Sequence, residues 1–391
     1  MVPVLSELLR NPAAARNRLR LHEVHTEDLL HRPPVELGHP EVRAAFTGKR
    51  ILVTGAGGSI GSELCRQIAG MNPALLVLLG HGENSVVATQ RELAQRCPEL
   101  ALCLVPVICD VRDASRVEHI VRHYRPHVIF HAAAHKHVPL MEENVAEATS
   151  NNIGGTRGVA RAAIRAGVER MVLISTDKAV NPTSVMGATK FLCEEIVRAE
   201  AERGGTGFIT VRFGNVLGSR GSVLPLFQEQ IALGGPLTIT HPEMVRYFMT
   251  IPEAASLVLH AGAIGESGSL YVLDMGKPVR IMDLAENLIR LSGLEPYRDI
   301  DIAVCGLRPG EKLAEELFTE TERDHMSAQG RMFAVPRPAY LAADDLDAVL
   351  DDLLALAGTH DDEAVRNRLG ELIPAFERWR RERHAAAEVE P

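Results

Sequence analysis

Lys-Arg-Ile-Leu-Val-Thr-Gly-Ala-Gly-Gly-Ser-Ile-Gly, residues 49–61, is the stretch that decides the fold. Its apolar residues at 51–53 predict a buried strand, and residues 59–69 predict the helix that follows. Three glycines spaced G-x-x-G-x-x-G lie between them, where glycine permits a tight turn. Backbone N–H groups at the start of such a helix bind the diphosphate of a dinucleotide. The residues expected at this dinucleotide site are Gly55, Gly58, Ser59, Ile60 and Gly61.

Short apolar runs continue to alternate with amphipathic helices as far as about residue 215. Strands are predicted at 75–79, 102–108, 128–131 and 171–175, with a helix at 85–96. Short apolar strands separated by helices indicate a parallel sheet covered on both faces. We therefore predict an α/β fold, a Rossmann-type doubly wound parallel sheet with a smaller C-terminal substrate-binding lobe.

The chain divides into four predicted parts. They are an N-terminal helical extension or linker at 1–48, a dinucleotide-binding Rossmann domain at 49–215, a substrate-binding lobe at 216–335 that is interleaved with the sheet, and a C-terminal helical tail at 336–391. Within the tail we expect an acidic amphipathic helix at 341–358 and one further helix near 363–383.

Composition narrows the class of protein. A net charge of −9 argues against nucleic acid or an anionic membrane as the main partner. No run of 18 apolar residues exists, so we expect no membrane span, and the first residues lack the apolar region of a signal peptide. The six cysteines are scattered without a C-x-x-C pair, which favours reduced thiols and a cytoplasmic location.

A cluster of reactive side chains follows the strand predicted at 171–175. Thr176, Asp177 and Lys178 supply a hydroxyl, a carboxylate and an amine in a row, at the strand end where open α/β sheets bind ligands. Met186 and Lys190 are four residues apart on the next predicted helix and so share one face. This arrangement predicts an acid/base site next to the dinucleotide.

The glycine spacing and the pair Met186 and Lys190 resemble the short-chain dehydrogenase/reductase superfamily. At the position of Met186 that superfamily nearly always has a tyrosine that acts as the catalytic base, and methionine has no proton to exchange. The resemblance implies a nicotinamide cofactor. Its other contacts would be Asp110 and Val111 near the adenine, Ala132, Ala133 and Ala134 under the cofactor, Lys136 near the active site, Asn152 at the helix that backs the site, and Lys190 at the nicotinamide ribose.

The choice between NAD and NADP depends on the end of the second strand. An acidic residue there would bind the ribose 2′-hydroxyl of NAD, and an arginine would favour NADP. Neither stands at that position, and His81, Glu83 and Asn84 follow it. We predict NADP or NAD, tightly bound and recycled, with a slight preference for NADP.

Residues 175–190, Ser-Thr-Asp-Lys-Ala-Val-Asn-Pro-Thr-Ser-Val-Met-Gly-Ala-Thr-Lys, resemble the polysaccharide-biosynthesis branch of extended short-chain enzymes. Residues 211–223, 240–250 and 306–312 resemble the same branch. That branch includes UDP-N-acetylglucosamine 4,6-dehydratases and UDP-sugar 4-epimerases. Residues 27–38 resemble the linker of its membrane-anchored long forms, so we expect a soluble catalytic unit that kept this linker.

The resemblance implies a 4,6-dehydratase that oxidises carbon 4, eliminates water across carbons 5 and 6, and returns hydride to carbon 6. Lys178 would be the carbon-5 base, Asp177 the carbon-6 acid, and Thr176 would orient the 4-hydroxyl. A lysine base requires a pKa lowered from about 10.4. The residues implied at the UDP-sugar are Lys136, Arg212, Asn215, Arg220, Val223, Arg246, Arg308 and Glu311.

Two alternatives remain open from the sequence. One is a UDP-sugar 4-epimerase of the same branch, and the other is a non-catalytic regulator that senses dinucleotide, which the loss of tyrosine at Met186 suggests. His131, His135 and His137 lack the further ligands of a metal site, so no metal is expected. We also expect a homo-oligomer.

Overall fold

A nine-stranded sheet forms the centre of the chain, of which this computed structural model describes residues 40–336 and 338–387. In spatial order its strands are β14 (Ser327–Gln329), β15 (Met332–Val335), β11 (Leu270–Leu273), β6 (Gly207–Arg212), β5 (Arg170–Ile174), β4 (Val128–His131), β1 (Arg50–Thr54), β2 (Leu75–Gly80) and β3 (Leu104–Ile108). The strands from β11 to β3 pair in parallel, and β14 and β15 join antiparallel. The strand order reverses between β1 and β4, which confirms the predicted doubly wound sheet.

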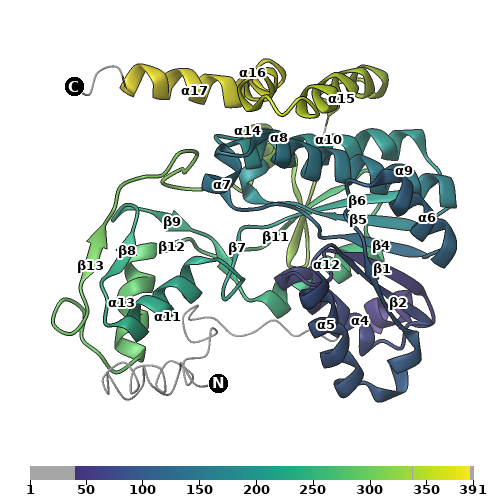
Figure 1. The fold of residues 1–391 in the computed structure, drawn as a ribbon, viewed down its shortest axis with the longest axis horizontal. Helices are drawn as coiled ribbons and strands as arrows, with labels where there is room; N and C mark the ends of the chain where they lie inside the picture. Colours follow the sequence, from purple (N-terminus) through teal and green to yellow (C-terminus); the bar gives the residue numbers. More distant parts are fainter. Residues whose placement is uncertain (1–39, 337, 388–391) are drawn as a thin grey trace.

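Successive side chains of each strand enter two different cores. Ile51 and Val53 belong to one core, whereas Leu52 between them belongs to the other. The first core is covered by α3 (Pro40–Phe46), α4 (Ser59–Ala69), α5 (Glu83–Arg96) and α12 (Ile251–Ile264). The second is covered by α6 (Ala114–Tyr124), α9 (Gly155–Ala166) and α10 (Val185–Arg203), so helices lie on both faces (Figure 1).

Short helices connect β4 to α9. They are α7 (Val138–Glu142), α8 (Val145–Ala148) and the π-helical turn η3 (Thr149–Gly154). A smaller lobe lies to one side of the sheet in Figure 1 and has its own core around Phe227, Leu284 and Leu288. Its elements are β7 (Asn215–Val216), α11 (Val223–Leu233), β8 (Leu237–Ile239), β9 (Val245–Arg246), β10 (Phe248–Met249), β12 (Val279–Arg280), α13 (Ile281–Leu291) and β13 (Ile302–Val304). The chain returns from this lobe through α14 (Glu320–His325) to the sheet.

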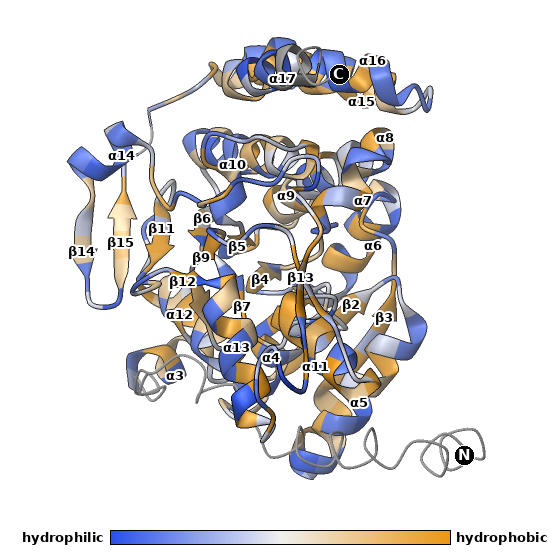
Figure 2. Cartoon of the chain, turned by 90° about the vertical axis from the view of Figure 1, so that its left-hand side faces the viewer, coloured by the Kyte–Doolittle hydropathy of each residue, from blue (hydrophilic) through white to orange (hydrophobic). Residues whose placement is uncertain are grey.

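The C-terminal helices form a third layer over α8 and α10 (Figures 1 and 2). They are α15 (Ala343–Ala357), α16 (Asp362–Leu372) and α17 (Pro374–Ala387). Leu346, Leu350 and Leu353 of α15 are buried in the core beneath. The expectation of one helix over 363–383 is wrong, because Pro374 cannot donate a backbone hydrogen bond and disfavours helical geometry at Ile373.

The strand expected at 102–108 also begins later than predicted. Pro98 starts a 3₁₀ helix, η2 (Pro98–Cys103), and the strand β3 begins only at Leu104. Leu102 is 97% exposed, so its apolar side chain does not mark a buried strand. The linker predicted at 27–38 lies outside the described residues.

Candidate active site

The predicted acid/base residues follow β5, in the middle of the sheet. Ser175, just after the strand, still donates its backbone N–H to the Val211 carbonyl of β6 at 2.7 Å. The chain then enters η4 (Asp177–Ala179), where the Thr176 hydroxyl accepts a hydrogen bond from the Lys178 backbone. Parallel strands end at a common edge, so the glycine turn after β1 and the cluster after β5 share that edge.

Asp177 and Lys178 form an ion pair inside this edge. Lys178 Nζ lies 2.9 Å from Asp177 Oδ1, which also accepts a hydrogen bond from Thr176 Oγ1 at 2.9 Å. The Asp177 side chain is fully buried, and that of Lys178 is 19% exposed. Asp177 Oδ2 has no hydrogen-bond partner within the described part of the chain. An unpaired buried carboxylate oxygen is unfavourable, so this atom is free to receive a polar group of a ligand.

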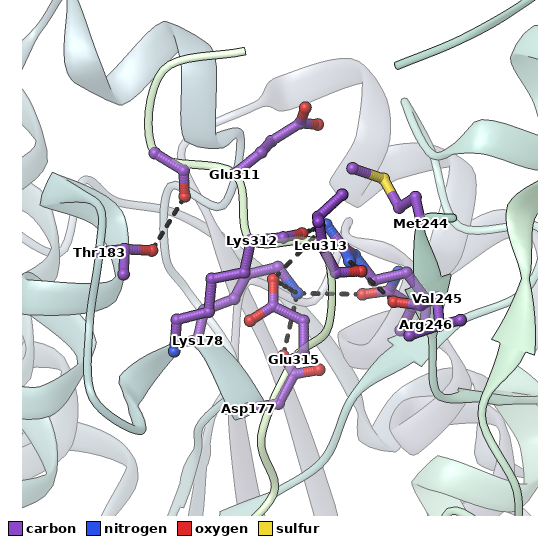
Figure 3. Close-up of polar contacts among 12 residues, drawn as sticks. Asp177, Lys178, Thr183, Met244, Val245, Arg246, Glu311, Lys312, Leu313 and Glu315 are labelled. Carbon is purple, nitrogen blue, oxygen red and sulfur yellow. Dashed lines mark hydrogen bonds and ion pairs between the residues drawn. The ribbon is translucent and has the colours of Figure 1, made fainter. Parts of the chain in front are cut away.

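Lys178 has further polar neighbours. Its ammonium donates to Asn215 Oδ1 at 3.0 Å and lies 3.8 Å from Glu315 Oε1 (Figure 3). Burial alone lowers the pKa of Lys178, but the carboxylates of Asp177 and Glu315 outweigh burial and raise this pKa. The lowered pKa that a lysine base requires is therefore not found here, because two carboxylates lie beside one amine.

Glu315 is a site residue that the sequence analysis missed. Its side chain is 4% exposed and lies 3.8 Å from Arg246 Nη2 as well as from Lys178. Burial is the main cause that raises the pKa of the Glu315 carboxyl. Residues 313–317, Leu-Ala-Glu-Glu-Leu, contain no motif, so only the folded chain brings Glu315 to this position.

Arg246, predicted to contact the substrate, is held by backbone oxygens. Its guanidinium donates to the carbonyls of Val245, Lys312 and Leu313 at 2.7 to 3.1 Å (Figure 3). These bonds tie β9 to the loop that carries Glu315. A contact between Arg246 and a substrate stays a prediction.

Met186 and Lys190 lie in the first two turns of α10, whose N-terminus is capped by Ser184. Met186 is 3% exposed. Lys190 is 4% exposed, and its ammonium donates to the Ile174 carbonyl at the end of β5 at 2.8 Å. The helix therefore holds Lys190 against the edge where Thr176 begins the acid/base cluster.

The glycine turn fits a dinucleotide diphosphate. Gly55 has φ +65°, and a Cβ on Gly61 would lie 2.2 Å from the Gly55 carbonyl oxygen. The first N–H groups of α4 have no side-chain cap and so remain available to an anion. Arg220, implied at the UDP-sugar, contacts this turn, because its Nη1 donates to Gly57 O at 2.7 Å and its N–H to Ser59 Oγ at 3.1 Å.

The other predicted cofactor residues surround the same edge. His81 lies between β2 and α5, and Glu83 and Asn84 are the first two residues of α5. Asp110 is bound by Arg112, whose hydrogen bonds lower the pKa of the Asp110 carboxyl, and Val111 packs against Gly155. Residues 132–134 follow β4, and the backbone of residues 132 and 133 touches the turn at Gly55.

Asn152 joins this loop to α10. Its amide donates to the His135 carbonyl at 3.1 Å and to Thr189 Oγ1 at 3.0 Å. Its oxygen accepts the His135 N–H at 2.8 Å. Asn152 thus positions the loop after β4, and a direct contact with the cofactor stays a prediction.

The residues implied at the UDP-sugar come from several loops. Lys136 donates to Ser219 Oγ at 3.3 Å, and Val223 begins α11. The backbone of Arg308 donates to Glu311 Oε2 at 3.0 Å in the loop before the Glu315 segment. The described contacts do not themselves join Arg308 or Glu311 to Lys178.

Arg212 differs from these residues because it lies in the protein interior. It is 1% exposed and pairs with Glu194 at 2.8 Å and with Glu322 at 2.9 Å. The Arg212 guanidinium is therefore paired with two carboxylates. A contact between Arg212 and a nucleotide stays a prediction.

The three histidines are not gathered around one point. His131 is buried, and its ring contacts Thr54 Oγ1 at 2.8 Å and Thr156 Oγ1 at 3.1 Å. Burial, helped by Lys190, lowers the pKa of His131 to about 3. Over residues 40–336 and 338–387, no group of three or more His, Cys, Asp and Glu is placed to hold a metal ion, and no helix has the length and apolarity to cross a membrane.

Among known proteins, the chain is similar to the capsular polysaccharide biosynthesis protein CapD of Staphylococcus aureus. The two are 49% identical over 354 residues, which is 90% of this chain but only 58% of CapD. The chain is also 33% identical to the UDP-glucose 4-epimerase of Rickettsia canadensis over 74% of its length and 84% of that enzyme. The chain thus spans little more than half of its capsular relative.

Solved structures share the fold. Pen from Bacillus thuringiensis is 31% identical and superposes with a TM-score of 0.69 over 78% of this chain and 99% of Pen. DesIV, a dTDP-glucose 4,6-dehydratase from Streptomyces venezuelae solved with NAD and TYD, is 24% identical with a TM-score of 0.61, over 77% of this chain and 96% of DesIV. These likenesses confirm the Rossmann-type architecture.

A family profile described as polysaccharide biosynthesis protein matches residues 51–337, from the first strand of the sheet to the end of β15 and just beyond. The match covers the glycine turn, the Asp177 and Lys178 pair and the Glu315 segment. It agrees with the resemblance of residues 175–190 and of the three later segments. The chain belongs to the polysaccharide biosynthesis protein family.

Proposed function

We propose that the chain catalyses the nicotinamide-dependent 4,6-dehydration of a UDP-hexosamine. The expected substrate is UDP-N-acetylglucosamine, and the product is a 4-keto-6-deoxy nucleotide sugar. The observation that carries this proposal is the buried pair of Asp177 and Lys178, 2.9 Å apart, at the same sheet edge as the glycine turn. Elimination of water requires an acid and a base that act close together, as this pair can.

The glycine turn and the uncapped start of α4 would hold the diphosphate of the cofactor, and Lys190 the nicotinamide ribose. A bound nicotinamide dinucleotide would accept a hydride from carbon 4 and deliver it to carbon 6. β2 ends in Leu79 and Gly80, without a carboxylate for the 2′-hydroxyl of NAD, which supports NADP. DesIV was solved with NAD, so mass spectrometry of the dinucleotide released from the purified protein decides between the two.

Each proton of the reaction needs its own carrier. Asp177, hydrogen-bonded to Thr176 Oγ1, would take the proton of the 4-hydroxyl and deliver it to the carbon-6 hydroxyl, which leaves as water. Lys178, as a neutral amine, would take the proton from carbon 5 and return it there in the last step. Met186 takes no part in proton transfer, because a thioether has no exchangeable proton.

The nucleotide would bind at the loops after β4, β7 and β13. Arg308 is exposed in the last of these loops and can offer paired donors to a diphosphate, and Glu311 can accept from ribose hydroxyls. The other proposed substrate residues are Lys136, Asn215, Arg220, Val223 and Arg246, together with the interior Arg212. The likeness to CapD supports a role in the synthesis of a surface polysaccharide.

The alternative with a specific observation behind it is a UDP-sugar 4-epimerase, which the 33% identity to the Rickettsia enzyme favours. An epimerase returns hydride to carbon 4 and needs no acid at carbon 6, so the buried acid/base pair favours dehydration.

We would incubate the purified protein with UDP-N-acetylglucosamine and analyse the product by mass spectrometry and NMR. A product lighter by one water supports dehydration, and an isomer of unchanged mass identifies an epimerase. No conversion of any UDP-hexosamine by protein with bound dinucleotide would instead favour a regulator.

A further inference from the structure

Lys178 is protonated in its ion pair with Asp177, and a protonated amine cannot act as a base. The inference below rests on the proposed dehydration, in which Asp177 moves the proton of the 4-hydroxyl and Lys178 moves the proton of carbon 5. Two carboxylates near the Lys178 ammonium stabilise its charged form. Asp177 cannot store the extra proton, because it must be free to accept the one from the 4-hydroxyl. Within the site, a third group can take it.

Glu315 is fixed at the right place by the loop that carries it. The Val245 N–H of β9 donates to the Leu313 carbonyl at 2.9 Å, and Arg246 Nη2 donates to the Lys312 carbonyl at 2.8 Å. On the other side, Thr183 Oγ1 donates to the Gly310 carbonyl at 3.1 Å (Figure 3). The loop is thus held both to β9 and to the segment before α10, and Glu315 points at the ion pair.

The charges around Glu315 come from each element packed against it. Asp177 and Lys178 approach from η4, Arg246 from β9 and Lys312 from its own loop, and Lys136 faces Lys178 from the loop after β4. The Lys312 ammonium donates a hydrogen bond to the Val180 carbonyl at 2.9 Å. Glu315 Oε2 has no hydrogen-bond partner among the described residues. A buried carboxyl with an unpaired oxygen is more easily protonated than an exposed one.

We propose that Glu315 accepts the proton of Lys178 and so creates the neutral amine that the reaction needs. One N–H bond of Lys178 breaks and one O–H bond of Glu315 forms, so an ammonium and a carboxylate become an amine and a carboxylic acid. No further reactant is needed. Oε1 lies 3.8 Å from Nζ, so the side chains must approach by less than about 1 Å to form a hydrogen bond. Glu315 acts only through Lys178 and is a positioning residue.

The pH profile of turnover tests this role. In the wild type the proton stays within the pair, so the fraction of neutral Lys178 and the turnover number stay nearly flat from about pH 7 to 9. In Glu315→Gln the proton must leave to solvent. Turnover should then depend on pH and rise close to tenfold per pH unit below the pKa of Lys178. Glu315→Asp keeps the carboxyl and should restore part of the flat profile.

Glu316→Gln is the matched control, because Glu316 is the adjacent carboxylate. Its Oε2 accepts a hydrogen bond from Asn181 Nδ2 at 2.8 Å, and its side chain is half exposed. It should retain the wild-type profile. A profile in Glu315→Gln that is as flat as that of the wild type, whether or not turnover is lower at every pH, would overturn the proposal. If the wild type itself forms no 4-keto-6-deoxy product, the proposed function fails instead, before the variants are compared.

A second measurement needs no turnover. The chain has only six lysines, Lys49, Lys136, Lys178, Lys190, Lys277 and Lys312. Their ¹³Cε signals can therefore be assigned with single Lys→Arg variants. Removal of the Glu315 charge should move the titration of Lys178 down by about 1 pH unit or more, whereas Glu316→Gln should not. An unchanged Lys178 titration in Glu315→Gln would contradict the coupling.

Discussion

The glycine turn and the acid/base cluster lie at the same edge of the sheet, but the chain builds them in opposite ways. The turn is one continuous segment, residues 55–61, and offers mainly uncharged backbone N–H groups. The cluster combines Asp177 and Lys178 with Asn215, Arg246 and Glu315, which come from separate segments. A site made of backbone groups is therefore specified by one short stretch of sequence. A site made of buried charges depends instead on how distant segments of the chain meet.

The two regions also differ in what stabilises them. The turn needs glycine, because a Cβ on Gly55 or on Gly61 would lie 2.8 or 2.2 Å from backbone atoms. The cluster is stable because its charges balance, and removing one partner leaves another charge buried without compensation. The predictions that follow test this difference, from the largest expected effect to the smallest.

The first prediction removes one charge of the cluster at a time. Asp177→Asn and Lys178→Ala should each reduce dehydration by about two orders of magnitude or more, the usual scale for losing a positioned acid or base. Binding of the nucleotide sugar, measured by calorimetry, should survive in both. Near-wild-type turnover in either variant would exclude that residue from the chemistry.

The second prediction adds one methyl group to the turn. In Gly61→Ala the Cβ would lie 2.2 Å from the Gly55 carbonyl oxygen, so the turn must move. Overpacking of about 1–3 kcal/mol should lower the affinity for the dinucleotide roughly 10- to 100-fold in calorimetry. Gly70→Ala is the control at the other end of α4, where the nearest atom is 3.5 Å away and φ is −66°. Equal dinucleotide affinities in Gly61→Ala and Gly70→Ala would show that the turn does not depend on a glycine at position 61.

The third prediction concerns His131, the buried last residue of β4, whose side chain is neutral in the folded chain. Its pKa is lowered from 6.5 to about 3, so the unfolded chain gains a proton below pH 6.5 that the folded chain does not. The free energy of unfolding should therefore fall by about 1.4 kcal/mol per pH unit from this residue as the pH drops from 6.5 towards 3. Urea unfolding of His131→Gln should show a shallower loss below pH 6.5. The exposed His119→Gln variant should match the wild type, and equal slopes in all three proteins would refute this account.

Much of the fold could be predicted because its signals are local. The strand at 128–131 and the helix at 59–69 have the predicted bounds, since continuous apolar runs and helical periodicity mark them. The single helix predicted over 363–383 failed at Pro374, a local signal that was present in the sequence and overlooked. Glu315 could not have been found in this way, because the contact between Lys178 and Glu315 depends on β9 and the 310–315 loop meeting in space.

The last prediction compares Met186 with Thr176, two residues of the site that carry no charge. Met186→Leu nearly conserves volume at a buried position, so it should change stability by less than about 1.5 kcal/mol and turnover only modestly. Thr176→Val keeps the shape but removes the hydroxyl that donates to Asp177 Oδ1 at 2.9 Å, so it should reduce turnover far more. Steady-state rates of both variants, with thermal unfolding to confirm the fold, give the order. If Met186→Leu is inactive while Thr176→Val turns over normally, the thioether has a chemical role and the proton route through Thr176 and Asp177 is wrong. The cluster would then extend onto α10, and its charged residues alone would not explain the chemistry at this edge of the sheet.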